Sequence, residues 1–356
     1  MTTIVSGSSI TFNDNTTQNT SAYGGGFAFR NKLINGGFDI AQRGTSFTST
    51  SSANNDDTYN LDRWYVLSDG NDIVDITQTT TVPTGAKYSI GLDVETVNKK
   101  FGIAQIIENA NCYDAIGGNV TLSFQARVSA TTKLDNVKCA VVAWSGTADT
   151  VTSDIISAWN VEGTNPTLIA NATYENTPAN LNVTTSWATY SVTANVDTAS
   201  TTNIIVFIWS DVTDTTLGDF LYVTNVQLEK GSTATSFDYR PYSAELAMCQ
   251  RYFQVIVSGS GYFCNASAQT STNAFGMYTL PVTMRTAPTG SVVSGTNYYR
   301  FLANDTDDFV DAVTVNGQTP NSVIIGNSTQ ISNTQGRPGI FTAQNAASFV
   351  AAQAEL

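Results

Sequence analysis

The chain is built from short segments in which apolar and polar residues alternate, and this pattern restricts it to antiparallel β-structure. In the clearest segment, "VTLSFQARVS", polar residues separate five apolar residues that share one face: Val120, Leu122, Phe124, Ala126 and Val128. A period of two is that of a half-buried strand. Polar turns such as "TSTSSANNDDTYN" separate the segments, with no useful amphipathic helical stretch among them. Many strands without crossover helices predict a sandwich.

Two segments, "KCAVVAWSG" and "NIIVFIWSD", differ from the others because apolar residues occupy both of their faces. Central strands that are covered on both sides have this composition. We therefore expect another part of the protein to cover the second face of their sheet.

Length and one helical segment predict the domain organisation. The 356 residues exceed the roughly 250 to 300 at which one hydrophobic core stops growing. The segment "SAELAMCQRYFQ" predicts a helix, with Ser243 as N-cap and Glu245 in the first turn, and "AYGGGFAF" predicts a hinge. We predict an all-β fold with an extended arm (1–29), a β-sandwich (30–243), and a short linking helix with a second, smaller β-sandwich (244–356). An arm without a core of its own needs a partner surface.

Charge and composition exclude several functions. The formal net charge of −13 repels phosphate backbones, and no basic stripe interleaved with aromatic residues offsets it, which excludes nucleic acid as a partner. The chain contains no histidine. This absence excludes Ser-His-Asp and Cys-His hydrolases and most zinc enzymes.

The start of the chain and its cysteines predict a protein that is made in a cytosol and stays soluble. "MTTIVSGSSITF" lacks the regions of a signal peptide, and no apolar run approaches the about 18 residues of a membrane span. The four cysteines share no C-x-x-C spacing, so we expect buried free thiols at Cys112, Cys139, Cys249 and Cys264.

Several motifs resemble a family of bacteriophage virion proteins found among tail fibres. They are "NKLINGGFDIAQRGTSF", "YNLDRWYV", "VTNVQLEKGSTATSFDYRPYSAELAMCQRYFQ", "LPVTMRTAPT" and the closing "AEL". The arm segment "ITFNDNTTQNT" is similar to repeats common in such fibres. The opening "NGGFD" and closing "VQLEKG" also resemble the first and last strands of jelly-roll carbohydrate-binding modules, which implies that the sandwich of residues 30–243 is a jelly roll.

The resemblance implies carbohydrate recognition by aromatic rings, amides and guanidinium groups. The candidate residues are Gln125, Arg127, Trp144 and Trp209, if the two tryptophans lie on the same sheet as the strand that carries Gln125. Burial of Trp144 and Trp209 in a core or a subunit interface is the alternative. We expect Trp64 to be core and Arg63 to pair with Asp62 or the terminal strand; Trp159 and Trp187 stay unassigned.

The resemblance implies no cofactor, although related modules often hold a structural calcium. The candidate ligands here are Asp39, Asn225 and Glu229, because a hard cation needs several oxygen atoms. The alternative is that Asp39 only stabilises a turn. For the arm, the resemblance implies docking onto the particle through Ile10, Phe12 and Asp14.

Acidic clusters offer an enzymatic alternative, since two carboxylates can hydrolyse a glycosidic bond. The clusters are Asp56–Asp57 and Asp305, Asp307 and Asp308, all in turns where Asp commonly supports the backbone. No fixed repeat of a β-helical depolymerase is present. We therefore expect a protein that is not an enzyme.

Together these features predict a phage tail fibre or other exterior virion component that assembles as a homotrimer with other virion proteins. It would bind a host cell-surface glycan without cleaving it. The alternative is a capsid or baseplate decoration protein that binds no sugar.

Overall fold

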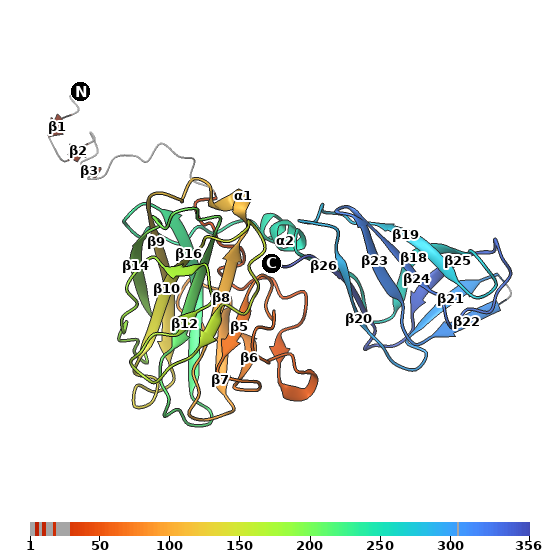
Figure 1. The fold of residues 1–356 in the computed structure, drawn as a ribbon, viewed down its shortest axis with the longest axis horizontal. Coiled ribbons are helices and arrows are strands. Elements are labelled where there is room, and N and C mark those ends of the chain that lie inside the picture. The colour runs from red at the N-terminus through yellow and green to blue at the C-terminus, as the bar shows by residue number, and fades with distance from the viewer. Residues whose placement is uncertain (1–3, 7–8, 12–16, 19–28, 305) are drawn as a thin grey trace.

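A computed structural model describes residues 4–6, 9–11, 17–18, 29–304 and 306–356 (Figure 1). The described chain is almost entirely strand and loop, with two α-helices. The predicted all-β class is therefore confirmed. None of these helices has the length and hydrophobicity needed to cross a membrane.

The described part of the arm contains three short strands that pair in an antiparallel sheet: β1 (Ile4–Ser6), β2 (Ser9–Thr11) and β3 (Thr17–Gln18). Ile10 pairs with Val5 of β1 and with Gln18 of β3. Phe12 and Asp14, the other two residues of the predicted docking arm, lie outside the described residues.

The first domain is a sandwich of two antiparallel sheets. The six-stranded sheet has the order β14 (Ala188–Asn195), β9 (Asn119–Val128), β16 (Phe220–Lys230), β7 (Ser89–Val94), β6 (Val74–Thr79) and β4 (Ser46–Phe47). The five-stranded sheet has the order β13 (Ala172–Tyr174), β10 (Val137–Trp144), β15 (Asn203–Ser210), β8 (Phe101–Ile107) and β5 (Tyr65–Ser68). A 3₁₀ turn (Ser49–Ser51) and α1 (Asn109–Cys112) lie in the connections.

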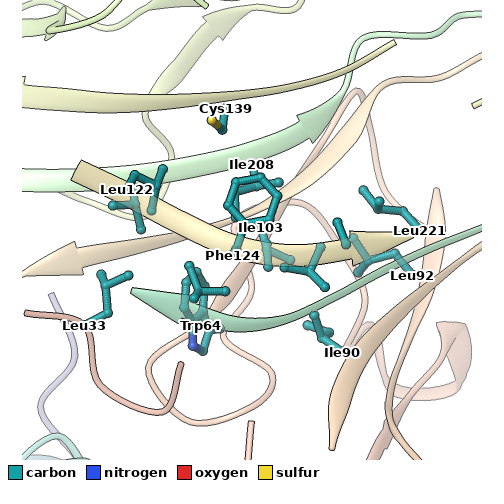
Figure 2. Close-up of a cluster of buried hydrophobic side chains, with 14 of the residues drawn as sticks. Leu33, Trp64, Ile90, Leu92, Ile103, Leu122, Phe124, Cys139, Ile208 and Leu221 are labelled. Carbon is teal, nitrogen blue, oxygen red and sulfur yellow. The ribbon is translucent and has the colours of Figure 1, made fainter. Parts of the chain in front are cut away.

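The main core lies between these two sheets (Figure 2). The alternation predicted for β9 is confirmed, because Leu122, Phe124 and their alternate neighbours point into this core. Trp64 packs there as predicted, with its ring centroid 5.3 Å from that of Phe38. Cys139 is also in this core, and all four cysteines are free and buried, as predicted.

The second face of the five-stranded sheet is covered, as the composition of β10 and β15 predicts. Every residue of both strands is buried. The segment 151–171, which includes the pair β11 (Ile156–Ala158) and β12 (Thr167–Leu168), packs over a second cluster that contains Phe207 and Trp209. We call residues 151–171 the cover segment.

The "NGGFD" loop joins the first domain to α2 (Tyr242–Gln250). Ile34 and Ile40, which flank the loop, pack in one cluster with Cys249 of the helix. A Cβ on Gly36 would lie 2.0 Å from the Val226 carbonyl oxygen, so only glycine allows this approach.

The predicted N-cap of this helix is wrong. Pro241, not Ser243, occupies the N-cap position, and no side chain caps the helix. Glu245 does lie in the first turn, where its carboxylate accepts hydrogen bonds from the Asn35 N–H and from Arg240.

The C-terminal domain is a single antiparallel sheet of ten strands around its own core. The order is β17 (Phe253–Ser258), β26 (Phe349–Gln353), β20 (Thr289–Val293), β23 (Thr314–Thr319), β24 (Ser322–Asn327), β19 (Ala274–Thr279), β18 (Gly261–Ala268), β25 (Pro338–Ala343), β21 (Tyr299–Ala303) and β22 (Thr306–Val310).

Charged residues join this domain to the first one. The guanidinium of the fully buried Arg63 binds the Glu355 carboxylate, which also pairs with Arg43 at 2.8 Å. Arg63 therefore pairs with the C-terminal segment. Arg251 donates two hydrogen bonds to Glu108, at 2.9 and 2.6 Å.

Candidate functional site

The outer face of the six-stranded sheet carries a row of aromatic and charged side chains. On β9, Gln125 and Arg127 alternate with core residues, so they point away from the core, as predicted. The register places Tyr222 of β16 directly opposite Arg127, with Gly91 of β7 on its other side. We call this surface the outer face; it is formed by Trp187, Arg127, Tyr222, Phe220, Gly91, Asp93, Asp75 and Thr77.

Three rings lie next to one another on the outer face. The Phe220 and Tyr222 rings are parallel within 4°, with their centroids 5.2 Å apart. The Trp187 ring lies 6.4 Å from Tyr222 on the other side. All three side chains are partly exposed. They therefore offer ring surface to a molecule outside the protein.

Arg127 and Asp93 place opposite charges beside these rings. The guanidinium carbon of Arg127 is 5.6 Å from the Tyr222 ring centroid, and Asp93 faces Phe220 across β7 and β16. Arg127 Nε and Asp93 Oδ1 are buried atoms without a hydrogen-bond partner among the described residues. These two atoms are buried, but both side chains are partly exposed, and neither side chain forms an ion pair with a described residue, so their accessible atoms can bind a ligand without breaking one.

The environment of Asp93 changes its titration. Burial, together with the nearby carboxylates of Glu95, Asp75 and Asp219, raises the pKa of Asp93 to about 6. Near neutral pH it is mostly an acceptor, and below about pH 6 it also supplies a proton to hydrogen-bond.

Gly91, at the centre of the outer face, has no side chain that would rise above the sheet beside Tyr222. A Cβ on Gly91 would lie 3.1 Å from Thr77 Oγ1 and 3.3 Å from the Tyr222 ring. Any larger residue at position 91 would therefore displace Tyr222 or lie over it.

Gln125 is on the outer face but is held by a neighbour. Its Oε1 accepts a hydrogen bond of 2.7 Å from Asn225 Nδ2. Asn225 also contacts the hydroxyl of Tyr239, whose O–H donates to the Gly85 carbonyl. Gln125 keeps its amide N–H groups for a ligand.

The structure does not bring Trp144 and Trp209 to the same site as Gln125 and Arg127. Both tryptophans lie on the five-stranded sheet, under the cover segment. Trp209 is 0% exposed and stacks on Phe207 at 4.5 Å. The prediction of one shared sheet is wrong, because β10 pairs with β13 and β15, and β15 pairs with β10 and β8, so that neither strand pairs with β9.

The three predicted calcium ligands have separate surroundings. Glu229 accepts hydrogen bonds from the Thr235 N–H and hydroxyl, both at 2.8 Å, whereas Asn225 binds Gln125. Asn225 and Glu229 are four positions apart on β16, about 13 Å in an extended strand. Asp39 lies near Lys87 and Glu245, and burial raises its pKa. Among the described residues, no group of three acidic or thiol side chains could hold a metal ion.

The carboxylates of the two acidic clusters support local structure. Asp56 Oδ1 accepts hydrogen bonds from the N–H groups of Ser68 and Asp57. Asp307 pairs with Arg300 at 3.0 Å, and Asp308 accepts from the Ser332 N–H. Asp305 lies outside the described residues.

Six residues of the outer face were not predicted from the sequence, and Trp187 was left unassigned; the six are Tyr222, Phe220, Gly91, Asp93, Asp75 and Thr77. The signal was the alternation already used for β9. In "FLYVT", Leu221 and Val223 point into the core, so Phe220 and Tyr222 must point outward. The same period in "SWATYSV" assigns Trp187 to the outer face.

Comparison with known protein families and with curated proteins finds no matching sequence. Several solved structures show a partial likeness. The enzymatically active domain of tailspike protein 4 from bacteriophage CBA120 is 16% identical, with a TM-score of 0.33; the match covers 57% of this chain and 22% of the tailspike chain.

Two carbohydrate-binding structures match over their whole length. The xylan-binding domain from Paenibacillus barcinonensis is 12% identical, with a TM-score of 0.33, and 59% of this chain is covered. A module bound to β-1,4-galactotriose is 15% identical, with a TM-score of 0.29, and 57% of this chain is covered.

Proposed function

We propose that the outer face of the first domain binds a glycan on the surface of a bacterium and does not cleave it. The observation that carries this proposal is the group of partly exposed rings, Trp187, Tyr222 and Phe220. Beside them lie Arg127 and Asp93, two partly exposed charged side chains that form no ion pair with a described residue. Aromatic rings pack against the C–H face of a sugar ring, and charged groups bind its hydroxyls.

The geometry of the sheet also suits an extended ligand. The row from Trp187 through Arg127, Tyr222 and Gly91 to Thr77 crosses neighbouring strands. Strands lie about 4.8 Å apart, so this row is about 20 Å long. A single small ligand would use only part of it. The proposed ligand is therefore a chain of several sugars.

In this proposal the protein is a phage virion component, a host-facing fibre. The support is the similarity of "NGGFDIAQRGTSF" and the neighbouring motifs to phage fibre proteins. Assembly as a trimer would present three outer faces together, and such multivalency raises affinity by about 10² to 10⁴. The arm would attach the protein to the particle.

Glycan-array binding by the full chain tests the proposal. Wild-type protein is expected to bind bacterial surface polysaccharides, and Trp187→Ala is expected to weaken this binding. Tyr113→Ala is the matched control, because Tyr113 is 88% exposed in the same domain but away from the outer face. If the wild-type chain binds no glycan on the arrays and no bacterial polysaccharide, the proposal of glycan binding is contradicted. That result would support the alternative of a capsid or baseplate decoration protein.

A separate experiment tests the arm. Deletion of residues 1–29 is expected to leave a folded protein, because both cores lie within residues 33–354, but to abolish incorporation into particles. Continued incorporation of the truncated chain would contradict the docking role.

A further inference from the structure

A buried group of charged residues fixes the cover segment to the five-stranded sheet, and the proposed glycan site makes no use of it. Lys138 of β10, Lys100 before β8 and Asp211 after β15 converge beneath the cover segment. The exposed fractions of their side chains are 7%, 1% and 0%. Lys138 Nζ is 2.7 Å and Lys100 Nζ is 2.5 Å from the Asp211 carboxylate.

The two lysines differ in their other partners. Lys100 Nζ also donates to the carbonyl oxygens of Val161 and Thr164, at 2.9 and 3.3 Å. Three oxygen atoms thus surround it, which matches the three donors of an ammonium group. Lys138 Nζ instead donates to a side-chain amide, Asn165 Oδ1, at 2.9 Å.

This contact places an amine nitrogen against an amide carbon. A C=O bond is about 1.2 Å long, so Lys138 Nζ lies within about 4 Å of Asn165 Cγ, close to the separation of reacting atoms in a near-attack arrangement. The Asn165 side is also held in place. The Tyr174 hydroxyl donates a hydrogen bond of 2.8 Å to the main-chain carbonyl of Pro166, the residue after Asn165. Asn160 Nδ2 donates to the main-chain carbonyl of Asn165 at 2.8 Å.

We propose that Lys138 and Asn165 form an intramolecular isopeptide bond, with Asp211 as the proton-transfer group. Lys138 gives a proton to the Asp211 carboxylate, and the freed lone pair attacks Asn165 Cγ. A Cγ–Nζ bond forms and the Cγ–Nδ2 bond breaks. The two protons that the Lys138 nitrogen loses, one of them relayed by Asp211, leave on Nδ2 as ammonium. No oxidant, metal or co-reactant is needed.

The bond would attach the cover segment covalently to a central strand. Without the bond, the segment is held by apolar packing over the second cluster, by the lysine contacts, and by hydrogen bonds from the Gly163 N–H to Asp211 and from Thr213 to Glu162. A cross-link at Lys138 would keep Trp209, its direct neighbour on β15, covered when local opening exposes other parts of the domain. This property is independent of the proposed glycan binding.

Intact mass spectrometry of the full chain under denaturing conditions tests the proposal. The expected mass is lower than that of the sequence by one ammonia molecule. Tryptic peptides are expected to include one branched species that joins the segments containing Lys138 and Asn165, because trypsin does not cleave after an acylated lysine. A mass equal to that of the unmodified sequence, or conversion of Asn165 to aspartate without a branched peptide, would overturn the proposal.

Variants identify the reacting groups. Lys138→Arg keeps the charge next to Asp211 but is expected to restore the full mass, as is Asn165→Ala. Lys100→Arg is the matched control and is expected to keep the mass loss, because it leaves the Lys138–Asn165 pair intact. Persistence of the mass loss in Lys138→Arg would contradict the assignment.

Discussion

Arg127 and Tyr222 are direct neighbours across β9 and β16, with the guanidinium carbon 5.6 Å from the centre of the ring. Both side chains point away from the core and are partly exposed. Arg127 forms no ion pair with any described residue of the chain. A charged group next to a ring, with free donors, is suited to bind a molecule that combines hydroxyls with an apolar face.

The first prediction concerns this guanidinium. Arg127→Met keeps an apolar stem beside Tyr222 but removes the donors, and we expect glycan affinity to fall by about 10- to 100-fold. A hydrogen bond to a charged group contributes about 1.5–3 kcal/mol. Titration calorimetry measures the change. Arg337→Met, in the C-terminal domain, is the control, and an equal loss in both variants would argue against a specific role of Arg127.

The second prediction concerns pH. The pKa of Asp93 is raised from 3.8 to about 6, chiefly by burial, so the folded state binds this proton more tightly than the unfolded state. The free energy of unfolding that Asp93 contributes must then fall as pH rises from about 4 to about 6.

Asp93→Asn removes this dependence. Relative to wild type, the variant is expected to gain stability as pH rises towards about 6 and to keep a constant difference above it. Urea unfolding at about pH 4, 5, 6 and 7 measures this difference. Asp56, whose pKa is also raised to about 6, contributes equally to both proteins. Parallel pH profiles would show that Asp93 is not the titrating group.

The third prediction tests whether Trp209 serves the core or the glycan site. Trp209 is fully buried under the cover segment, so Trp209→Ala is expected to lower the free energy of unfolding by about 3–5 kcal/mol. The fraction that stays folded is expected to bind glycan like the wild type. Loss of binding by folded Trp209→Ala would show that the five-stranded sheet takes part in recognition.

The fourth prediction concerns the contact between the domains. Arg63→Ala removes a buried partner of Glu355 and a guanidinium that lies 3.6 Å from the Tyr252 ring centroid. We expect the free energy of unfolding to fall by about 3 kcal/mol, because the Glu355 carboxylate stays largely buried after its Arg63 partner is removed. Thermal or urea unfolding measures it. Lys133→Met, which breaks an exposed pair with Asp214, is the control and should change little. Equal effects would contradict the importance of this contact.

The sequence was sufficient for the all-β class because its strands have a regular period. Alternation in β9 assigned Phe124 to the core and Arg127 to the surface, and the apolar character of β15 predicted a cover on its second face. Which strands pair is a different question. Periodicity does not say whether Trp209 lies on the sheet of Arg127, since that depends on contacts between segments about 80 residues apart along the chain.

The site was only partly predictable for the same reason. Gln125 and Arg127 could be found within one strand. Tyr222, Trp187 and Asp93 become neighbours only through the register of four strands. The N-cap of α2 also escaped prediction, because Pro241 takes that position and Glu245 is used to bind the "NGGFD" loop.

Binding at the outer face is decided by calorimetric titration of wild type and Tyr222→Ala, each as the full chain, with the glycan that gives the strongest array signal. Removal of the middle ring is expected to weaken binding by about tenfold or more, about 1.4 kcal/mol, while the unfolding transition stays cooperative. Equal affinity of a folded Tyr222→Ala protein would contradict binding at the outer face.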